Sequence, residues 1–232
     1  MNYKIVALLP MKANSERVKG KNFRDFCGKP LFRWVLDTLL SVPEISRVVI
    51  NTDAREILRA HGLEDSERVK VRDRPLEICG DLVSMNEVIR DDVSNTDADI
   101  FLMTHTTNPL LSKKSIESAL HVFKKSLRER KHDSLFTVNR VQDRFYTVDA
   151  KPINHDPKKL IRTQDLEPWY QENSNLYLFT KQSFGITEAR IGLTPTMFVT
   201  EPFESTDIDT PDDWSFAESV VTYYRAKGVI AL

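Results

Sequence analysis

The sequence predicts an α/β fold with a Rossmann-like, doubly wound and mostly parallel sheet. The first observation is that short apolar runs, typical of strands covered on both faces, alternate with segments whose apolar residues recur at helical spacing. The second is that polar clusters follow the ends of these runs, where open parallel sheets bind their ligands. The chain has 232 residues, enough for one large domain, so residues 1–232 are expected to form a single domain.

The order of the elements supports this fold class. Strands are expected at residues 3–9, 46–51, 69–71, 99–104 and 134–139. Helices are expected between them at residues 31–40, 54–61, 84–93 and 112–129, with Asp53 as the N-cap of the second. This alternation predicts parallel strands with helices on both faces of the sheet. Strands at 175–180 and 196–199 and a helix at 212–227 follow.

The segment 140–173 breaks the alternation. It is polar, contains three prolines and shows no helical or strand period. A stretch of this length without regular structure is usually a functional loop or an arm. We therefore expect an excursion from the domain that packs against another subunit.

Composition narrows the class of protein. The net charge is −1, so the chain has no overall positive field for nucleic acid. Two cysteines are too few for a disulfide scaffold or a Cys-rich zinc site, and they fit a reducing cytoplasm. The apolar run near the N-terminus is too short for a signal peptide, and no later run approaches a membrane span. We expect a cytoplasmic protein with no nucleic-acid or membrane partner.

The connection after the first expected strand is rich in cations. Between Lys12 and Lys21 it also carries Arg17 and Lys19, against one acid, Glu16. Such a loop suits a polyphosphate, to which backbone N–H groups add further donors. A solvated basic loop is an equally good interpretation of these residues alone. The glycine patterns of dinucleotide-binding proteins and P-loop NTPases are absent from the sequence, so a phosphate loop here would be of another kind.

Asp207 and Asp209 flank Ile208 near the end of the chain. In an extended segment these two carboxylates point to the same side. Mg²⁺ binds one or two carboxylates together with phosphate oxygens and water, so the pair is a candidate metal site. The alternative is that both acids simply precede and cap the last helix.

Four further polar residues are candidates for ligand contacts, each with a structural alternative. Arg74 can bind a phosphate through two parallel hydrogen bonds, bind a base edge, or form a surface salt bridge. Ser84 is expected to cap a helix. His105 can bind a ligand or exchange protons, or be structural. Asn173 suits a turn or sugar hydroxyls.

Six segments, in order along nearly the whole chain, carry a family resemblance. They are MKANSERVKGKN, CGKPL, RPLEICGD with Ser84, TTNPLL, NSNLYLF and DIDTPDDW. Together they resemble the acylneuraminate cytidylyltransferase (CMP-sialic acid synthetase) family. The resemblance implies a sheet of the nucleotide-diphospho-sugar transferase type, a homodimer, Mg²⁺ and CTP. It also implies that a sugar hydroxyl attacks the α-phosphorus of CTP and releases pyrophosphate.

The resemblance assigns roles to individual residues. Lys12 and Lys21 would neutralise the triphosphate, with Ser15 and Asn22 placing it. Arg74 and Ser84 would surround the cytidine, and His105 and Asn173 would face the acceptor sugar. Asp207 and Asp209 would hold Mg²⁺ against the phosphates. The residues expected to act in catalysis are Lys12, Lys21 and Asp209.

Three departures from the family pattern leave alternatives open. Lys12 stands where the family usually has Arg, so a non-catalytic nucleotide-binding homologue is one alternative. His105 replaces a Gln that helps to read the acceptor, and Ser174 replaces a Gly. The acceptor could therefore be sialic, legionaminic or pseudaminic acid, another acid sugar, or a different sugar or polyol phosphate. Cations of the excursion are a further option for a sugar carboxylate, namely Arg140, Arg144 and Arg162.

Overall fold

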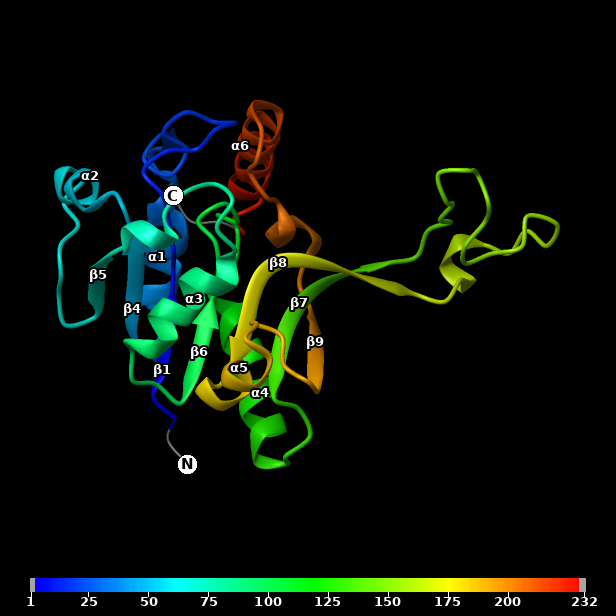
Figure 1. The fold of residues 1–232 in the computed structure, drawn as a ribbon. Helices are drawn as coiled ribbons and strands as arrows, with labels where there is room; N and C mark the ends of the chain where they lie inside the picture. Colours follow the sequence, from blue (N-terminus) through cyan, green and yellow to red (C-terminus); the bar gives the residue numbers. More distant parts are fainter. Residues whose placement is uncertain (1–2, 230–232) are drawn as a thin grey trace.

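The computed structural model describes residues 3–229, in which a seven-stranded sheet forms the centre of the molecule (Figure 1). In spatial order the strands are β5 (Val69–Asp73), β4 (Ile45–Thr52), β1 (Ile5–Leu8), β6 (Ile100–Met103), β8 (Trp169–Phe179), β7 (Ser134–Val141) and β9 (Pro195–Val199). Strand β8 runs antiparallel to both of its neighbours, and every other pairing in this seven-stranded sheet is parallel. The mostly parallel, Rossmann-like sheet is thus confirmed.

All the helices predicted from the sequence are present. They are α1 (Leu31–Ser41), α2 (Arg55–Ala60), α3 (Met85–Ser94), α4 (Lys113–Arg128) and α6 (Pro211–Ala226). A short helix, α5 (Lys181–Thr187), and the two-residue strands β2 (Asp25–Phe26) and β3 (Lys29–Pro30) were not predicted. None of the helices within residues 3–229 combines the length and the apolar character needed to cross a bilayer.

Helices cover both faces of the sheet, which explains the continuous apolar runs. In β1, Ala7 packs in a core cluster with residues of α1 and α4, whereas Leu8 packs in a second cluster with residues of α3 and α5. Successive side chains of a strand point to opposite faces, so every position of β1 and β6 is buried.

A third apolar cluster joins the first loop to the C-terminal helix. Val18 of the loop packs in it with Phe26, Ile208 and Trp214. The Phe26 and Trp214 rings meet edge to face, with their centroids 5.3 Å apart. Burial of Ile208 therefore holds the two flanking aspartates beside the basic loop.

The excursion predicted at 140–173 is an arm that projects from the sheet (Figure 1). The prediction that it lacks regular structure is wrong at both ends, because β7 continues to Val141 and β8 begins at Trp169. These ends pair with each other, Val141 opposite Trp169, and form a two-stranded stalk. At its end Phe145 stacks on Trp169 at 5.0 Å between centroids. The arm exposes several large apolar side chains, namely Tyr146, Val148, Ile153, Leu160 and Ile161.

Candidate functional site

A cavity of about 300 Å³, hereafter the main cavity, opens at the carboxyl ends of β1, β5 and β6. Its walls are the loop after β1, the segment between β5 and α3, and the residues that follow β6. Six residues predicted from the sequence line it: Lys12, Ser15, Lys21, Asn22, Arg74 and His105. The expectation that the polar ends of the parallel strands meet at one site is therefore confirmed.

Lys21 connects the basic loop to the segment with the two aspartates. Its side chain is only 10% exposed, and its Nζ donates to the carbonyl oxygen of Ile208 at 2.8 Å. The same Nζ lies 3.1 Å from Asp209 Oδ1. Arg17 Nη2 lies 3.0 Å from the other carboxylate oxygen of Asp209. Two cations of the loop thus bind one carboxylate, and the interpretation of a merely solvated loop is wrong for Lys21.

Asp207 and Asp209 are not the caps of the last helix. Thr210 accepts from the backbone N–H of Asp213, whose carboxylate in turn accepts from the N–H of Thr210, and this pair caps α6. Asp207 is exposed by surface area, although loss of hydration at its carboxyl raises its pKa. A hydrogen bond from Thr107 opposes this rise in the pKa of Asp207, and the charge of Asp209 adds to it.

The aspartate pair suits a cation whose remaining ligands come from a substrate and from water. Within residues 3–229 no group of three or more His, Cys, Asp or Glu side chains is arranged to hold a metal ion. A closed zinc site would need such a group. Mg²⁺ needs only one or two carboxylates when phosphate oxygens and water supply the remaining ligands, and here it would share Asp209 with Lys21 and Arg17.

Asn22 ties two walls of the main cavity together. Its Nδ2 donates to the carbonyl oxygen of Lys12 at 2.8 Å, and its Oδ1 accepts from Thr106 Oγ1 at 2.7 Å. The loop is also held by Asp53, whose Oδ1 accepts from the backbone N–H of Ala13 at 2.7 Å. The prediction that Asp53 caps α2 is therefore wrong, because its carboxylate is committed to the loop.

Lys12 forms an ion pair with Asp81 in the lining of the main cavity. Its Nζ lies 2.5 Å from Asp81 Oδ1, and this hydrogen bond lowers the pKa of Asp81. Because both residues line the main cavity from different loops, an anion that binds Lys12 must compete with Asp81. Sequence reasoning did not identify this partner of Lys12.

Arg74 is a buried cation with neutral partners. It is 8% exposed, its Nε donates to Asn51 Oδ1 at 2.9 Å, and its Nη2 donates to the carbonyl oxygens of Asn51 and Met11 at 2.9 and 3.3 Å. Among the described residues no carboxylate forms an ion pair with it, so the alternative of a surface salt bridge is wrong. Burial lowers the pKa of Arg74. A buried charge without a counterion favours a ligand that supplies one or accepts its hydrogen bonds.

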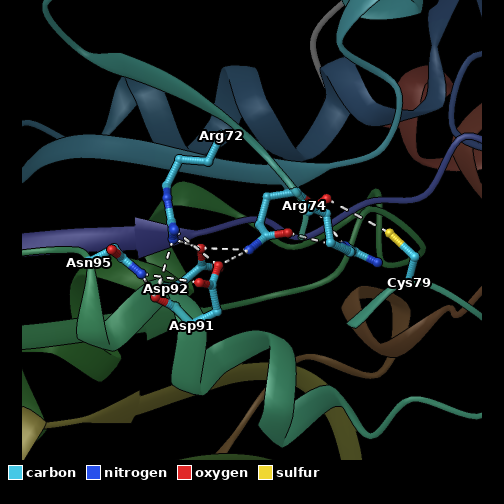
Figure 2. A network of polar contacts seen from close by, with 7 residues as sticks. Arg72, Arg74, Cys79, Asp91, Asp92 and Asn95 are labelled. Atoms are coloured by element: carbon cyan, nitrogen blue, oxygen red, sulfur yellow. Dashed lines mark hydrogen bonds and ion pairs between the residues drawn. The ribbon is translucent and has the colours of Figure 1, made fainter. Parts of the chain in front are cut away.

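The orientation of Arg74 depends on a polar network behind it (Figure 2). Asn51 is fully buried, and its Nδ2 donates to one carboxylate oxygen each of Asp91 and Asp92, both at 2.9 Å. Arg72 bridges the same two carboxylates at 3.0 and 2.6 Å. Burial raises the pKa of Asp92 to about 6. The network fixes the Asn51 amide, which in turn leaves its oxygen facing Arg74.

Four of the predicted residues lie outside the lining of the main cavity, namely Ser84, Asn173, Asp207 and Asp209. Ser84 is exposed and caps α3, accepting from the backbone N–H of Asn86 at 3.3 Å, so its predicted cap is confirmed. Asn173 Nδ2 donates to Asn139 Oδ1 at 3.0 Å and to Thr200 Oγ1 at 2.8 Å. It thus links β8 to β7 and to the residue after β9. The ligand contacts of Ser84 and Asn173 stay predictions.

His105 lies against a cation that the sequence did not reveal. Its Nε2 is 3.3 Å from Nη1 of Arg190, which follows the unpredicted helix α5. Burial, and then the charge of Arg190, lower the pKa of His105 to about 4. The imidazole is therefore neutral near pH 7, which favours a hydrogen-bonding role over that of a charged acid.

Known proteins similar to this chain are cytidylyltransferases. The family model described as Cytidylyltransferase matches residues 6–221. N-acylneuraminate cytidylyltransferase A of Danio rerio is 27% identical over 97% of this chain and 52% of the relative. Pseudaminic acid cytidylyltransferase of Campylobacter jejuni is 25% identical over 93% of this chain and 95% of the relative. The chain thus spans about half the length of the first of these relatives.

Solved structures share the fold at low sequence identity. A CMP:2-keto-3-deoxy-manno-octonic acid synthetase complexed with CTP superimposes with a TM-score of 0.66 at 14% identity, covering 95% of this chain and 99% of that one. A 4-diphosphocytidyl-2C-methyl-D-erythritol synthase from Anaerococcus prevotii gives a TM-score of 0.67 at 13% identity, covering 94% and 96%. The family match extends over nearly the whole sheet and both sides of the main cavity. The chain belongs to the cytidylyltransferase family.

Proposed function

We propose that the protein couples CTP to an acid sugar, a sialic acid or a related nonulosonic acid, and releases pyrophosphate. The observation that carries the proposal is that Lys21, which lines the main cavity, joins the basic loop to the segment with the aspartate pair through Ile208 and Asp209. Membership of the cytidylyltransferase family supports the reaction. The names of relatives that act on acylneuraminate and pseudaminic acid support the class of acceptor.

In this reaction the chain would act by positioning and by charge rather than by covalent chemistry. Lys12 and Lys21 would neutralise the triphosphate, and Lys12 would leave Asp81 to do so. Ser15 lines the same wall, while Asn22 holds the loop in shape. Arg74 would bind the cytidine part of the nucleotide through Nη1, since its Nε and Nη2 are engaged by Asn51 and Met11.

Mg²⁺ is part of the proposal. Asp207 and Asp209 would hold it beside the phosphates, since carboxylate and phosphate oxygens are the ligands that Mg²⁺ takes in nucleotide sites. When bound, the ion would withdraw charge from the phosphate oxygens and make the α-phosphorus more electrophilic. Arg17 and Lys21, which bind the carboxylate of Asp209, would add positive charge for the phosphates.

The direct test is pyrophosphate release with CTP, Mg²⁺ and a panel of acid sugars, with ATP, GTP and UTP in place of CTP as controls. We expect release with CTP and one class of acid sugar. Release only with a sugar phosphate or polyol phosphate would contradict the proposed acceptor class but support the proposed reaction. Binding of CTP with no release for any acceptor would favour a non-catalytic homologue.

We further propose that the arm mediates a homodimer. Val148 and Leu160 are 107% and 79% exposed on it, and a pair of arms would cover such apolar side chains. Replacing both with Asp is expected to convert a dimer to a monomer in light scattering at micromolar concentration. The matched control is Leu193→Asp, which changes a 70% exposed leucine outside the arm and is expected to leave the dimer intact. A wild-type protein that is already monomeric would contradict the proposal.

A further inference from the structure

A second cavity, hereafter the side cavity, lies next to the main cavity. It has a volume of about 280 Å³ and is lined by Ser84, Met85, Asn86, Glu172, Ala189, Arg190 and Ile191. Met85 lines both cavities. His105 lines the main cavity and contacts Arg190, which lines the side cavity. A ligand larger than a nucleotide would therefore find space on the His105 side of the main cavity.

Arg190 is the cation of this space and is held in a defined orientation. Its Cζ lies 3.8 Å from the centroid of the Tyr177 ring, and its side chain is 22% exposed. Its Nη2 lies 3.6 Å from Glu172 Oε1, an oxygen that also accepts from the Tyr177 hydroxyl. Stacking on the ring fixes the plane of the guanidinium group while leaving its edges available for hydrogen bonds.

The hydrogen-bonding capacity of Arg190 is largely unused by the described part of the chain. Its contact with Glu172 is longer than a hydrogen bond, and its Nε has no partner among residues 3–229. Nη1 faces His105 Nε2 at 3.3 Å and the sulfur of Met103 at 4.0 Å. A guanidinium group has five donors in a planar fork that matches a carboxylate. This geometry is suited to an anionic ligand.

We propose that Arg190 binds the carboxylate of the acceptor sugar and makes the enzyme select an acid sugar. The inference rests on the proposed function. In nonulosonic acids the attacking hydroxyl and the carboxylate are on the same carbon, so the carboxylate must lie close to the reacting centre. Arg190 meets this condition through His105, which it contacts at 3.3 Å and which lines the main cavity together with Lys21. A neutral imidazole adds no second positive charge at this place.

The arginines of the arm are the alternative source of a carboxylate-binding cation. Arg144 Nη2 donates to the carbonyl oxygen of Ile161 at 2.5 Å, and Arg162 forms an ion pair with Asp165 at 2.7 Å. Both belong to the arm that projects from the sheet, so within one chain they lie away from the main cavity (Figure 1). Arg190, by contrast, contacts His105 of the main cavity within a single chain.

The test compares an acid acceptor with its neutral analogue. Wild type, Arg190→Met and Arg190→Lys are assayed for pyrophosphate release with CTP and either N-acetylneuraminate or its C1 carboxamide, or with the best acid sugar of the panel and its amide. Arg190→Met is expected to raise KM for the acid about 10- to 100-fold, because it removes a charge-assisted hydrogen-bonded pair. Arg190→Lys should recover part of the loss, since a point charge replaces the fork. KM for CTP and for the amide should stay unchanged.

The matched control is Arg90→Met. Arg90 is an exposed arginine of α3 that forms a single ion pair with Glu188 at 3.4 Å and lines neither cavity. It is expected to behave as wild type with both acceptors. An Arg190→Met enzyme with wild-type KM for the acid would overturn the role of Arg190 and leave the proposed function standing. A parallel rise in KM for acid and amide would also overturn it, as a purely structural effect. Wild-type release with neutral or phosphorylated acceptors alone would overturn both proposals.

Discussion

Asp209→Asn is expected to lower kcat for pyrophosphate release about 100- to 1000-fold while the fold survives. The substitution keeps the shape of the side chain but removes the negative charge that Lys21 and Arg17 bind at 3.1 and 3.0 Å. It also removes one of the two carboxylates available to Mg²⁺. Loss of a charge that acts on the reacting phosphates should appear in kcat, and the thermal midpoint should change little because Asp209 is partly exposed.

The control for this change is Asp212→Asn, which removes an exposed acid from the first turn of α6 that, unlike Asp209, pairs with neither Lys21 nor Arg17. Its kcat is expected to equal that of wild type. Titration of MgCl₂ adds a second readout, since Asp209→Asn should need more Mg²⁺ for half-maximal activity if the carboxylate binds the ion. Unchanged turnover of Asp209→Asn at all Mg²⁺ concentrations would remove Asp209 from the catalytic residues.

The fold could be predicted from the sequence where local patterns and burial agree. The runs that became β1 and β6 are apolar at every position because both of their faces are covered. The stalk was missed because its strands lie beyond the sheet, and the residues of β8 from Trp169 to Glu172 are exposed. A strand with no buried face has no apolar pattern to detect. Helix α5 has only seven residues, too few to establish a helical period.

The residues of the site also differ in whether local sequence could predict them. Lys12, Lys21 and Arg74 could be predicted because they follow strand ends, and the topology brings such ends together. Asp53 was assigned by a local capping rule, whereas in the structure a contact with Ala13, across two strands, determines its role. Arg190 and Asn51 could not be found, since nothing near them in the sequence marks them. Their importance comes from neighbours such as His105 and Asp92, which lie far away along the chain.

Because Asn51 binds residues from several distant parts of the chain, its replacement is expected to have a large effect on stability. Asn51→Ala is expected to lower the free energy of unfolding by about 2–4 kcal/mol in urea denaturation. The substitution leaves Arg74 Nε without its acceptor and takes one donor each from Asp91 and Asp92, all at buried or half-buried positions. Arg74 would also lose its fixed orientation, so KM for CTP should rise about tenfold.

The matched control is Asn95→Ala, which changes the same residue type at the exposed end of the same network (Figure 2). Asn95 Nδ2 donates to the carbonyl oxygen of Asp91 at 2.8 Å and to its Oδ1 at 3.1 Å, where water can replace it. Its loss should cost less than about 1 kcal/mol and leave KM for CTP unchanged. Equal effects of the two substitutions on stability and on KM would mean that Asn51 has no special role in orienting Arg74. A destabilised Asn51→Ala protein with wild-type KM for CTP would show that the network contributes to stability but not to CTP binding. Arg74 would then not be a nucleotide contact.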